Sequence, residues 1–512
     1  MLQSSITAKF LKKLWYLLTD SLFYKIILIF LSFIAESYKT SYLRKFLLSL
    51  GCLDRFADSS FFCKIYKSAK KVFYGLAMYI SEAARRSFIL KIYNKLCLGS
   101  LLFGKKELFA LLISVMFLIP HSYWNNIYGL FISLILLVLY VFSISDPDKN
   151  INGNELIMKD KHIPFSFLLF GFSIFIAVLT SNDINDSLRV LFFFIASFIM
   201  CFSVSRRINT KEMLDCFMKF IYFTLILMSF VSIGQRILGV EADASLTDLT
   251  LNKDMPGRVF GTMDNPNNLA EYLTIFIPFG FAYSLNRKSA DQKLLYLVFM
   301  IFPIASILMT YARSSWIALA IVAVVYIVLY NYKLLPAFFI AGVAMIPFIP
   351  QNIYNRILTI GNLKDSSSAY RIEIWSGCLE MLKKYWFTGV GLGPGAFGKI
   401  FPKYAFGETT VVMHSHMQFM EMLVEGGILC FIGYIAMAYG VIRAACVASA
   451  RVTDGFKHYV VAAAASVSGI TLIGMFEYCW FYPRVMFAFF ISVGLCLAVS
   501  RMAENSSEGN ND

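Results

Sequence analysis

The sequence contains few charged residues, and this shortage excludes most soluble folds. Only 15% of its 512 residues are Asp, Glu, Lys or Arg, whereas 58% are hydrophobic. Soluble globular domains are typically about 25% charged and about 45–50% apolar. In lipid the backbone amides of an apolar run have no solvent partners, so each run must form a helix; the short alternating strands of a membrane barrel are not evident. The composition therefore predicts an all-α polytopic membrane protein.

A regular cysteine framework is also missing. The ten cysteines are scattered: several lie in apolar runs, such as Cys201 and Cys430, others lie in the basic N-terminal region, such as Cys52, and only Cys378 is well inside the long polar segment described below. Neither a disulfide set nor a zinc site follows from this distribution. The N-terminus lacks the compact apolar core and the small-residue cleavage site of a secretory signal peptide, so no cleaved leader is expected.

Acidic residues are outnumbered by basic ones, 32 against 46, which gives a formal net charge of +14. In a soluble protein this excess would indicate nucleic acid, but in a membrane protein it is typical of cytoplasmic loops that face anionic lipid. A nucleic-acid partner is therefore not expected. In residues 1–107, pairs of basic residues alternate with short apolar pieces. This region is expected to form basic amphipathic helices on the cytoplasmic membrane surface; an additional span near residues 21–35 is the alternative.

The apolar runs from residue 108 onwards predict about twelve transmembrane helices. Together they form the expected membrane domain, residues 108–503, which is followed by a polar C-terminal tail at 504–512. The expected spans are 108–121, 127–144, 163–180, 187–205, 213–238, 266–286, 293–311, 313–330, 333–350, 417–442, 458–479 and 484–500.

The positions of Lys and Arg orient these spans. If the two lysines at 105–106 are cytoplasmic, every second connection is basic, whereas the alternate short connections carry no Lys or Arg. Basic connections are retained in the cytoplasm. Both termini are therefore expected in the cytoplasm of a multi-pass protein of the cytoplasmic (inner) membrane. The outer face is then expected to hold the 239–265 connection, the turn at Arg313 and the 351–416 loop.

A long polar loop, residues 351–416, separates the ninth and tenth spans. Loops of this size are uncommon unless they have a function, so this extracytoplasmic loop is the expected catalytic region. Before it, Arg313 lies in a tight turn between two spans, at the N-terminus of the second. Free amides, the helix dipole and a guanidinium together form an anion site. The alternative is an interfacial arginine that extends to the membrane surface beside Trp316.

Residues 366–386, inside this loop, have apolar side chains at three- and four-residue spacing. This pattern predicts an amphipathic helix in the outer interface, with serines able to cap its start. Arg371 is then in the first turn, where a cation is unfavourable unless an anion or Glu373 compensates it. The glycine-rich stretch at 389–395 either allows the backbone to approach a ligand closely or forms a plain flexible loop.

His416 lies at the mouth of the tenth span. His416 and Gly427 are eleven residues apart, which returns almost to the same helix face. The glycine is therefore expected to let a neighbouring helix approach, while His416 faces the external surface or a cavity. Ionisable residues at a span mouth are often functional. His414 is either its partner or an idle surface residue. The two histidines do not share a helical face and no outer carboxylate cluster accompanies them, so a metal site is not expected.

Taken in order, these features resemble the O-antigen ligase / O-antigen polymerase superfamily of bacterial membrane glycosyltransferases. The likeness extends from about Gly261 to Cys430. Residues 265–267, Asn-Pro-Asn, are similar to a family segment that opens a span, and residues 310–319 are similar to the arginine motif. Residues 416–427 are similar to the family's histidine, eleven-residue interval and glycine.

Three positions depart from the usual pattern of that superfamily. Met417 stands where Asn, Ser or Gln is common, Ile317 where leucine is common, and Cys430 where a small or hydroxylated residue is expected. The spacing to Gly427 places His416, not His414, in the register of the family histidine.

Enzymes of this superfamily transfer a glycan from an undecaprenyl pyrophosphate carrier to an acceptor hydroxyl on the outer face, without a metal or other cofactor. The resemblance implies His416 as the general base, a role worth about 10²–10⁴-fold in rate. It implies Arg313 and Arg371 as pyrophosphate ligands, because guanidinium groups stabilise the charge that develops on the leaving group. Three further residues are implied as accessory: His414, Asn265 and Asn267.

The resemblance does not separate a ligase, whose acceptor is a lipid or protein, from a polymerase, whose acceptor is another carrier-linked repeat. A transporter or flippase of lipid-linked saccharides is the alternative without bond formation; it would predict charges within spans and internally similar halves, but few charges lie at mid-span and no repeat is obvious. The basic N-terminal region could also act as an assembly scaffold alongside catalysis. Sugar, acceptor and oligomeric state are not specified by the sequence.

Overall fold

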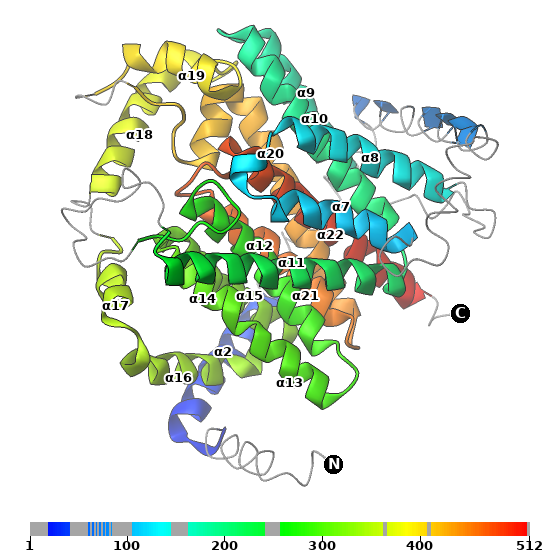
Figure 1. The fold of residues 1–512 in the computed structure, drawn as a ribbon, viewed down its shortest axis with the longest axis vertical. Coiled ribbons are helices and arrows are strands. Elements are labelled where there is room, and N and C mark those ends of the chain that lie inside the picture. Colours follow the sequence, from blue (N-terminus) through cyan, green and yellow to red (C-terminus); the bar gives the residue numbers. More distant parts are fainter. Residues whose placement is uncertain are drawn as a thin grey trace.

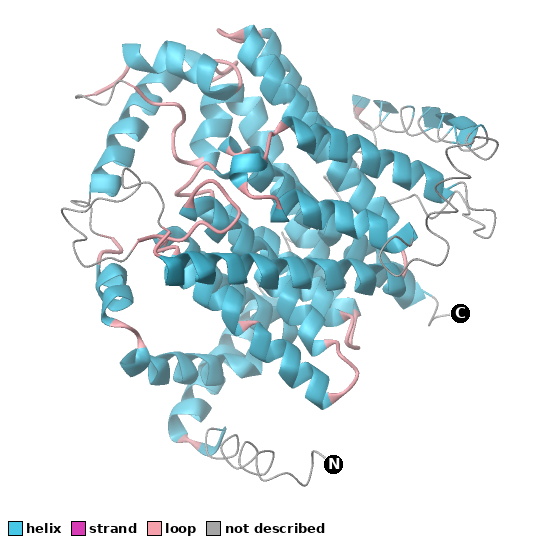
Figure 2. Ribbon diagram, viewed as in Figure 1, coloured by secondary structure: helices cyan, strands magenta, loops and turns pink. Residues whose placement is uncertain are grey.

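The structure is a computed structural model in which residues 19–40, single positions between 60 and 83, and residues 105–144, 162–240, 257–361, 366–406 and 411–508 are described. Within these ranges every regular element is a helix, and no strand occurs (Figure 2). The all-α class predicted from the composition is therefore confirmed.

The helices follow one another in a bundle whose arrangement is shown in Figure 1. In the first half of the chain they are α2 (Leu22–Thr40), α7 (Lys105–Leu118), η2 (His121–Tyr123), α8 (Ile127–Ile144), α9 (His162–Leu179), α10 (Ile184–Arg207) and α11 (Lys211–Leu238). They continue with α12 (Pro266–Leu285), α13 (Ala290–Phe299), α14 (Ile301–Met309), α15 (Arg313–Asn331), η5 (Tyr332–Leu334), α16 (Leu335–Met345), η6 (Ile346–Phe348) and α17 (Gln351–Leu358). The last are α18 (Ser366–Tyr385), α19 (Gly393–Ile400), η7 (Phe401–Lys403), α20 (Gln418–Arg451), α21 (Lys457–Ile473), η8 (Cys479–Phe481) and α22 (Pro483–Glu508).

Short polar side chains determine where several helices begin. The Thr210 hydroxyl accepts a hydrogen bond from the Met213 amide (3.2 Å) at the start of α11. The Ser289 hydroxyl does the same for the Gln292 amide (3.2 Å) at the start of α13. These contacts satisfy amides that have no partner within the first turn. α11 ends at Gly239, whose φ of 68° closes the last turn.

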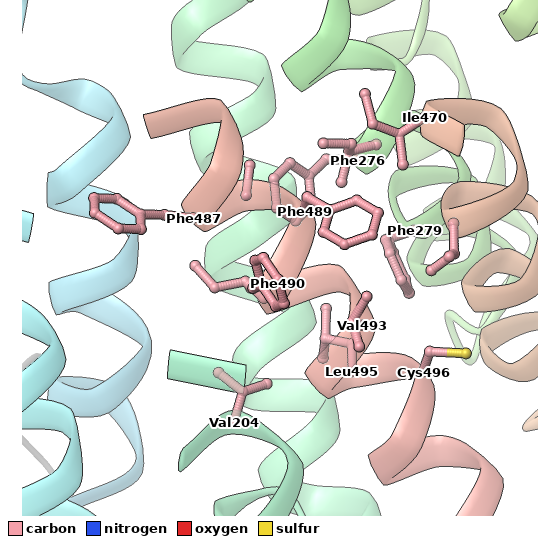
Figure 3. Close-up of a cluster of buried hydrophobic side chains, with 14 of the residues drawn as sticks. Val204, Phe276, Phe279, Ile470, Phe487, Phe489, Phe490, Val493, Leu495 and Cys496 are labelled. Carbon is pink, nitrogen blue, oxygen red and sulfur yellow. The ribbon is translucent and has the colours of Figure 1, made fainter. Parts of the chain in front are cut away.

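The C-terminal helix α22 lies inside the bundle and packs against α10, α20 and α21. Nearly all of its apolar length is buried. Figure 3 shows Phe489, Phe490 and Val493 of this helix close to Phe276 and Phe279 of α12. The core is therefore built around the end of the chain.

The expected spans overlap the helices of this region; 293–311 corresponds to α13 and α14, and 333–350 to η5, α16 and η6. Most ends agree within about three residues, but α20 continues to Arg451, nine residues beyond the expected 442. Six helical segments are long and apolar enough to cross a membrane: Ile184–Arg207, Lys211–Leu238, Ala290–Met309, Arg313–Phe348, Gln418–Arg451 and Pro483–Asn505. Shorter apolar helices include Ile127–Ser143, Phe165–Leu179 and Lys457–Ile473. The chain is a membrane protein, and the number of twelve spans stays a prediction.

The chain reverses direction between α15 and α17. α15 has 19 residues and is therefore about 28 Å long, at about 1.5 Å per residue. Arg313, its first residue, donates from Nη1 to the carbonyl of Thr359 (2.9 Å), just after α17. Residues 332–359 must therefore return along the length of α15. This return brings α17, and α18 after it, to the end of the bundle that carries Arg313.

Much of the N-terminal region 1–107 lies outside the described residues, and its expected membrane-surface location stays a prediction. Helix α2 is described and packs beside α16, where the Tyr24 hydroxyl donates to the carbonyl of Lys333 (2.8 Å). Several apolar side chains of α2 are exposed, among them Ile29 and Phe33. At the other end of the chain, α22 continues to Glu508, so the first part of the expected polar tail is helical.

Candidate active site

Glu477, in the connection between α21 and η8, joins three segments that are far apart in the sequence. Its Oε1 forms an ion pair with Nη2 of Arg371 on α18. The same oxygen accepts a hydrogen bond from Nδ2 of Asn267 at the start of α12 (3.3 Å). Its Oε2 lies 3.8 Å from Nδ1 of His416. A single buried carboxylate thus brings the predicted arginine, asparagine and histidine residues together.

The surroundings of Glu477 keep it ionised. Burial alone would raise the pKa of this carboxyl, but Arg371, and then His416 and His414, outweigh it and lower the pKa to about 2. A carboxylate that is paired in this way stays negative at physiological pH. It can therefore orient a neighbouring imidazole and stabilise its protonated form.

His416 lies two residues before α20, with a side chain that is 28% exposed. Its φ of 55° is in the left-handed region, which residues other than glycine seldom adopt. The entry into α20 is held by the Gln418 amide, which donates to the carbonyls of Gly474 (2.8 Å) and Glu477 (3.0 Å). The ring of Tyr370 approaches the His416 ring edge-on, with centroids 5.8 Å apart. His416 is thus accessible and is held in an unusual backbone conformation.

His414 has a different environment. Its ring is packed against Phe481 (centroids 4.4 Å apart) and against His416 (4.1 Å). Its Nδ1 accepts a hydrogen bond from the backbone amide of His416 (3.1 Å). Burial and the charges of His416 and Arg371 lower the pKa of His414 to about 3, although Glu477 acts in the opposite direction. A neutral, enclosed imidazole with one nitrogen already occupied is suited to holding the His416 backbone.

Arg371 lies in the second turn of α18, because that helix begins at Ser366, whereas the first turn was expected. Its counter-ion is Glu477, which lies outside the 351–416 loop. The sequence predicted Glu373 or a bound anion in this role. Nη1 of Arg371 also donates to the Ser367 hydroxyl (2.9 Å). α18 is anchored by an apolar cluster that includes Ile374, Cys378 and Met381. The amphipathic pattern thus predicted the helix correctly, and the helix directs Arg371 toward the site.

The two asparagines of the Asn-Pro-Asn segment have different roles. Asn265 caps α12: its Oδ1 accepts from the amides of Asn267 (2.8 Å) and Asn268 (3.0 Å). Asn267 faces the site, where its Oδ1 accepts from Nη2 of Arg258 (2.6 Å) and its Nδ2 donates to Glu477. Asn265 therefore shapes the helix start that presents Asn267.

Arg258 was not singled out in the sequence, yet it connects the Asn-Pro-Asn segment to the arginine motif. Its Nε donates to the carbonyl of Thr310 (2.7 Å), and its side chain is buried. Burial, and then the positive charges of Arg356, Arg371 and Arg313, lower the pKa of Arg258 to about 10, while Glu477 opposes them. A group of guanidinium charges this close together is a favourable place for an anion.

Two sequence signals could have identified Arg258 and Glu477. Arg258 lies in the 239–265 connection, on the side expected to be poor in basic residues. Glu477 is an acidic residue within an expected apolar span, 458–479, and such residues are commonly functional. Neither residue belongs to a recognisable short motif.

Arg313 begins α15 and faces α17. Its Nη1 donates to the carbonyl (2.9 Å) and hydroxyl (3.3 Å) of Thr359. Two residues earlier, Tyr311 has a φ of 53°, and its hydroxyl accepts from Nδ2 of Asn352 on α17 (2.7 Å). The arginine motif therefore holds α17 in place and adds its charge to the group around Arg258. These contacts differ from the expected alternative of an arginine that merely extends to the membrane surface.

Gly427 has a different role from the one expected. It interrupts α20, with φ 68° and ψ −171°, and the Ile428 amide donates to the carbonyl of Trp386 (2.8 Å). A Cβ at Gly427 would lie 2.0 Å from the carbonyl oxygen of Phe387. The close neighbour is thus a loop backbone and not a helix. His416 precedes the helix, so the expected shared helix face is wrong.

The glycine-rich stretch approaches the backbone of α20 closely and is not a plain flexible loop. The Val390 and Gly391 amides donate to the carbonyls of Val424 (2.9 Å) and Glu425 (3.0 Å) in α20. Gly389 has φ 72°, and a Cβ there would lie 2.1 Å from the Glu425 carbonyl oxygen. Loop 386–391 therefore pairs with the break in α20 and fixes the helix that follows His416.

Comparison with protein families agrees with the motif order. Residues 296–435 match the family model Wzy_C, described as O-antigen ligase. The matched segment includes Arg313, Arg371, His416 and Gly427, whereas the Asn-Pro-Asn segment precedes it. The resemblance predicted from these residues is confirmed over this segment. A comparison with curated proteins finds no match.

Proposed function

Starting from the O-antigen ligase domain at residues 296–435, we propose that the protein is a membrane glycosyltransferase of cell-envelope polysaccharide biosynthesis. It transfers a glycan from an undecaprenyl pyrophosphate carrier to an acceptor hydroxyl on the outer face of the cytoplasmic membrane. The observation that carries this proposal is the convergence of His416, Arg371 and Asn267 on the buried carboxylate of Glu477.

His416 acts as the general base in this proposal. Its Nδ1 faces Glu477, at 3.8 Å, which leaves Nε2 for the acceptor hydroxyl. Glu477 orients the imidazole and stabilises the imidazolium that forms when His416 takes the proton. His414 holds the backbone of His416 through its Nδ1. The two histidines thus divide into a base and a positioning residue.

Arg371, Arg313 and Arg258 stabilise the pyrophosphate. Arg371 lies beside the base, through their shared partner Glu477. The charges of Arg371 and Arg313 both act on Arg258 and lower its pKa, after the larger effects of burial and Arg356. A lipid pyrophosphate gains negative charge as it leaves, and positioned guanidinium groups lower the energy of that state. Electrostatic stabilisation of this kind needs no metal, so the reaction is proposed to be metal-independent.

The transfer step follows from these roles. The acceptor oxygen forms a bond to the anomeric carbon of the glycan as its proton passes to His416. The bond between that carbon and the pyrophosphate oxygen breaks, and its electron pair leaves with the carrier. The arginines hold the resulting anion, and the proton later passes from His416 to solvent. Whether the acceptor is a lipid, a protein or a second carrier-linked repeat decides between ligase and polymerase.

The test is a reconstituted reaction without added metal, using undecaprenyl pyrophosphate-linked glycans isolated from the host cell. Carrier release and product size are measured for the wild type, for His416→Ala, and for His121→Ala as a control at an exposed histidine outside the site. We expect release with wild type and His121→Ala and a loss of at least about 10²-fold with His416→Ala. A single-step product indicates a ligase, and a ladder indicates a polymerase.

A result without carrier release would contradict the proposed enzyme. If no carrier is released, but labelled lipid changes leaflet equally with the wild type and His416→Ala, the protein is a transporter of lipid-linked saccharides and not an enzyme.

A further inference from the structure

Two buried acidic residues at the start of α20 have no role in the reaction described so far. Glu421 and Glu425 are one helical turn apart, and their side chains are 0% and 1% exposed. Within the part of the chain that the structure describes, neither forms an ion pair with Lys, Arg or His. Buried carboxyl groups without a cation are costly and need other partners.

Glu421 is connected to His416 through a single residue. Its Oε2 accepts a hydrogen bond from the backbone amide of Ser415 (2.5 Å). The carbonyl of Ser415 accepts from Nε1 of Trp375 on α18 (3.0 Å), and its hydroxyl donates to the carbonyl of Met417 (3.0 Å). The residue immediately before His416 is therefore held at its amide, its carbonyl and its side chain.

The hydrogen bonds of Ser415 restrain the backbone immediately before His416. His416 has a φ of 55°, and a residue other than glycine keeps such a conformation only when the surrounding contacts impose it. Without the Glu421 carboxyl, the Ser415 amide would be buried without a partner, and the peptide before His416 would be free to turn. Glu421 is thus one of the groups that fix the direction of the His416 ring.

Glu425 is connected to the other half of the site. Its Oε1 accepts from the Gly393 amide at the start of α19 (2.7 Å), and its Oε2 accepts from the hydroxyl of Tyr478 (3.4 Å). Tyr478 directly follows Glu477 in the chain. Glu421 and Glu425 are four residues apart, which places them on one face of α20. The pair therefore links the segment that carries His416 to the segment that carries Glu477.

We propose that Glu421 and Glu425 form a positioning pair that fixes His416 against Glu477. Both carboxyl groups are buried away from cations and are held by neutral donors: two backbone amides and a tyrosine hydroxyl. This inference rests on the proposed function, since it assigns a purpose to the orientation of the base.

Two substitutions of Glu421 separate its hydrogen bond from its volume. Glu421→Gln keeps an oxygen that accepts from the Ser415 amide. Glu421→Met keeps a similar volume but removes the acceptor. Glu380→Met, on the surface of α18, where Glu380 pairs with Lys383, is the matched control. The full chain is reconstituted with undecaprenyl pyrophosphate-linked glycans from the host cell, and kcat, KM and carrier binding are measured separately.

We expect Glu421→Met to lower kcat about 10²-fold, because a small displacement of a reacting group has an effect of this size. KM and carrier binding should change little, since the arginines are untouched. Glu421→Gln and Glu380→Met should stay within about threefold of the wild type. Unfolding temperatures identify variants that fail to fold, and Glu421→Gln keeps the proposal testable if Glu421→Met is among them.

Three outcomes would contradict the positioning role of Glu421 and Glu425 while leaving the proposed function intact. They are full kcat in Glu421→Met, a loss in Glu421→Gln as large as that in Glu421→Met, and equal losses of kcat and carrier binding in Glu421→Met. Failure of the proposed function is recognised separately, because His416→Ala would then be as active as the wild type.

Discussion

Two histidines that are two residues apart have opposite environments. His416 faces an ionised carboxylate, whereas the ring of His414 packs against Phe481 and its Nδ1 accepts from a backbone amide. The sequence could identify His416 only through its spacing to Gly427, and it left the role of His414 open. Glu477 lies 61 residues beyond His416, in a different helix connection (477 − 416 = 61); its position within an expected apolar span was a signal, but nothing in the sequence paired it with His416. Such a partner is defined by folding and not by a local pattern.

Substitution of the central carboxylate tests the arrangement at the residue scale. Glu477→Gln should lower kcat about 10²-fold, because His416 loses the charge that orients it and stabilises its protonated form. Arg371 also loses its counter-ion, so KM should change as well. Carrier release in the reconstituted system measures both constants, with Glu380→Gln on α18 as the control. Wild-type activity in Glu477→Gln would mean that His416 works without this partner.

The same carboxylate predicts how stability depends on pH. The pKa of Glu477 lies below its usual value of 4.5, at about 2, so the unfolded chain takes up this proton more readily than the folded protein. The stabilisation is therefore complete above about pH 4.5 and is lost as the pH falls toward 2. We expect the difference in Tm between wild type and Glu477→Gln to be constant from about pH 5 to about pH 8 and to shrink below about pH 4.5. A difference that stays constant down to pH 3 would contradict this pKa.

At the scale of elements, the decisive feature is the interruption of α20. The eleven-residue spacing correctly drew attention to Gly427, but the physical reason inferred from it was wrong. A helical repeat placed His416 and Gly427 on one face, whereas the helix begins after His416 and breaks at Gly427. Periodicity assumes a continuous helix, and a paired loop from residues 386–391 is invisible to it.

Gly427→Ala is the corresponding test. The new Cβ would overlap the Phe387 carbonyl oxygen, and the φ of 68° is strained for alanine, which costs about 1–3 kcal/mol before any clash is counted. We expect a lower Tm and a reduced kcat, because loop 386–391 must move away from the helix that follows His416. Gly234→Ala in α11, where a Cβ would meet nothing within 4 Å, is the control and should change neither quantity appreciably. Equal behaviour of the two variants would show that the break is not required.

At the scale of the whole molecule, composition and apolar runs predicted most of the bundle. The all-α class and the helix positions followed from hydrophobicity, because lipid leaves the backbone no other regular structure. Hydrophobicity did not predict that α22 is buried inside the bundle, since a span that faces lipid and one that faces protein are equally apolar. The sequence placed the Arg313 turn and the 351–416 loop on one face, but it did not predict the contacts of Arg313 with Thr359 and of Asn352 with Tyr311. The site is assembled by this long-range packing of segments whose individual motifs the sequence already displays.

The central claim is that His416 performs chemistry while Arg371 binds the pyrophosphate. The most direct test measures, in one preparation, the binding and single-turnover release of undecaprenyl pyrophosphate-linked glycan for wild type, His416→Ala and Arg371→Lys. We predict that His416→Ala binds the carrier like the wild type but releases it at least about 10²-fold more slowly. Arg371→Lys should bind more weakly, because an ammonium cannot reproduce the planar fork of the guanidinium. Release from His416→Ala at the wild-type rate would contradict the account.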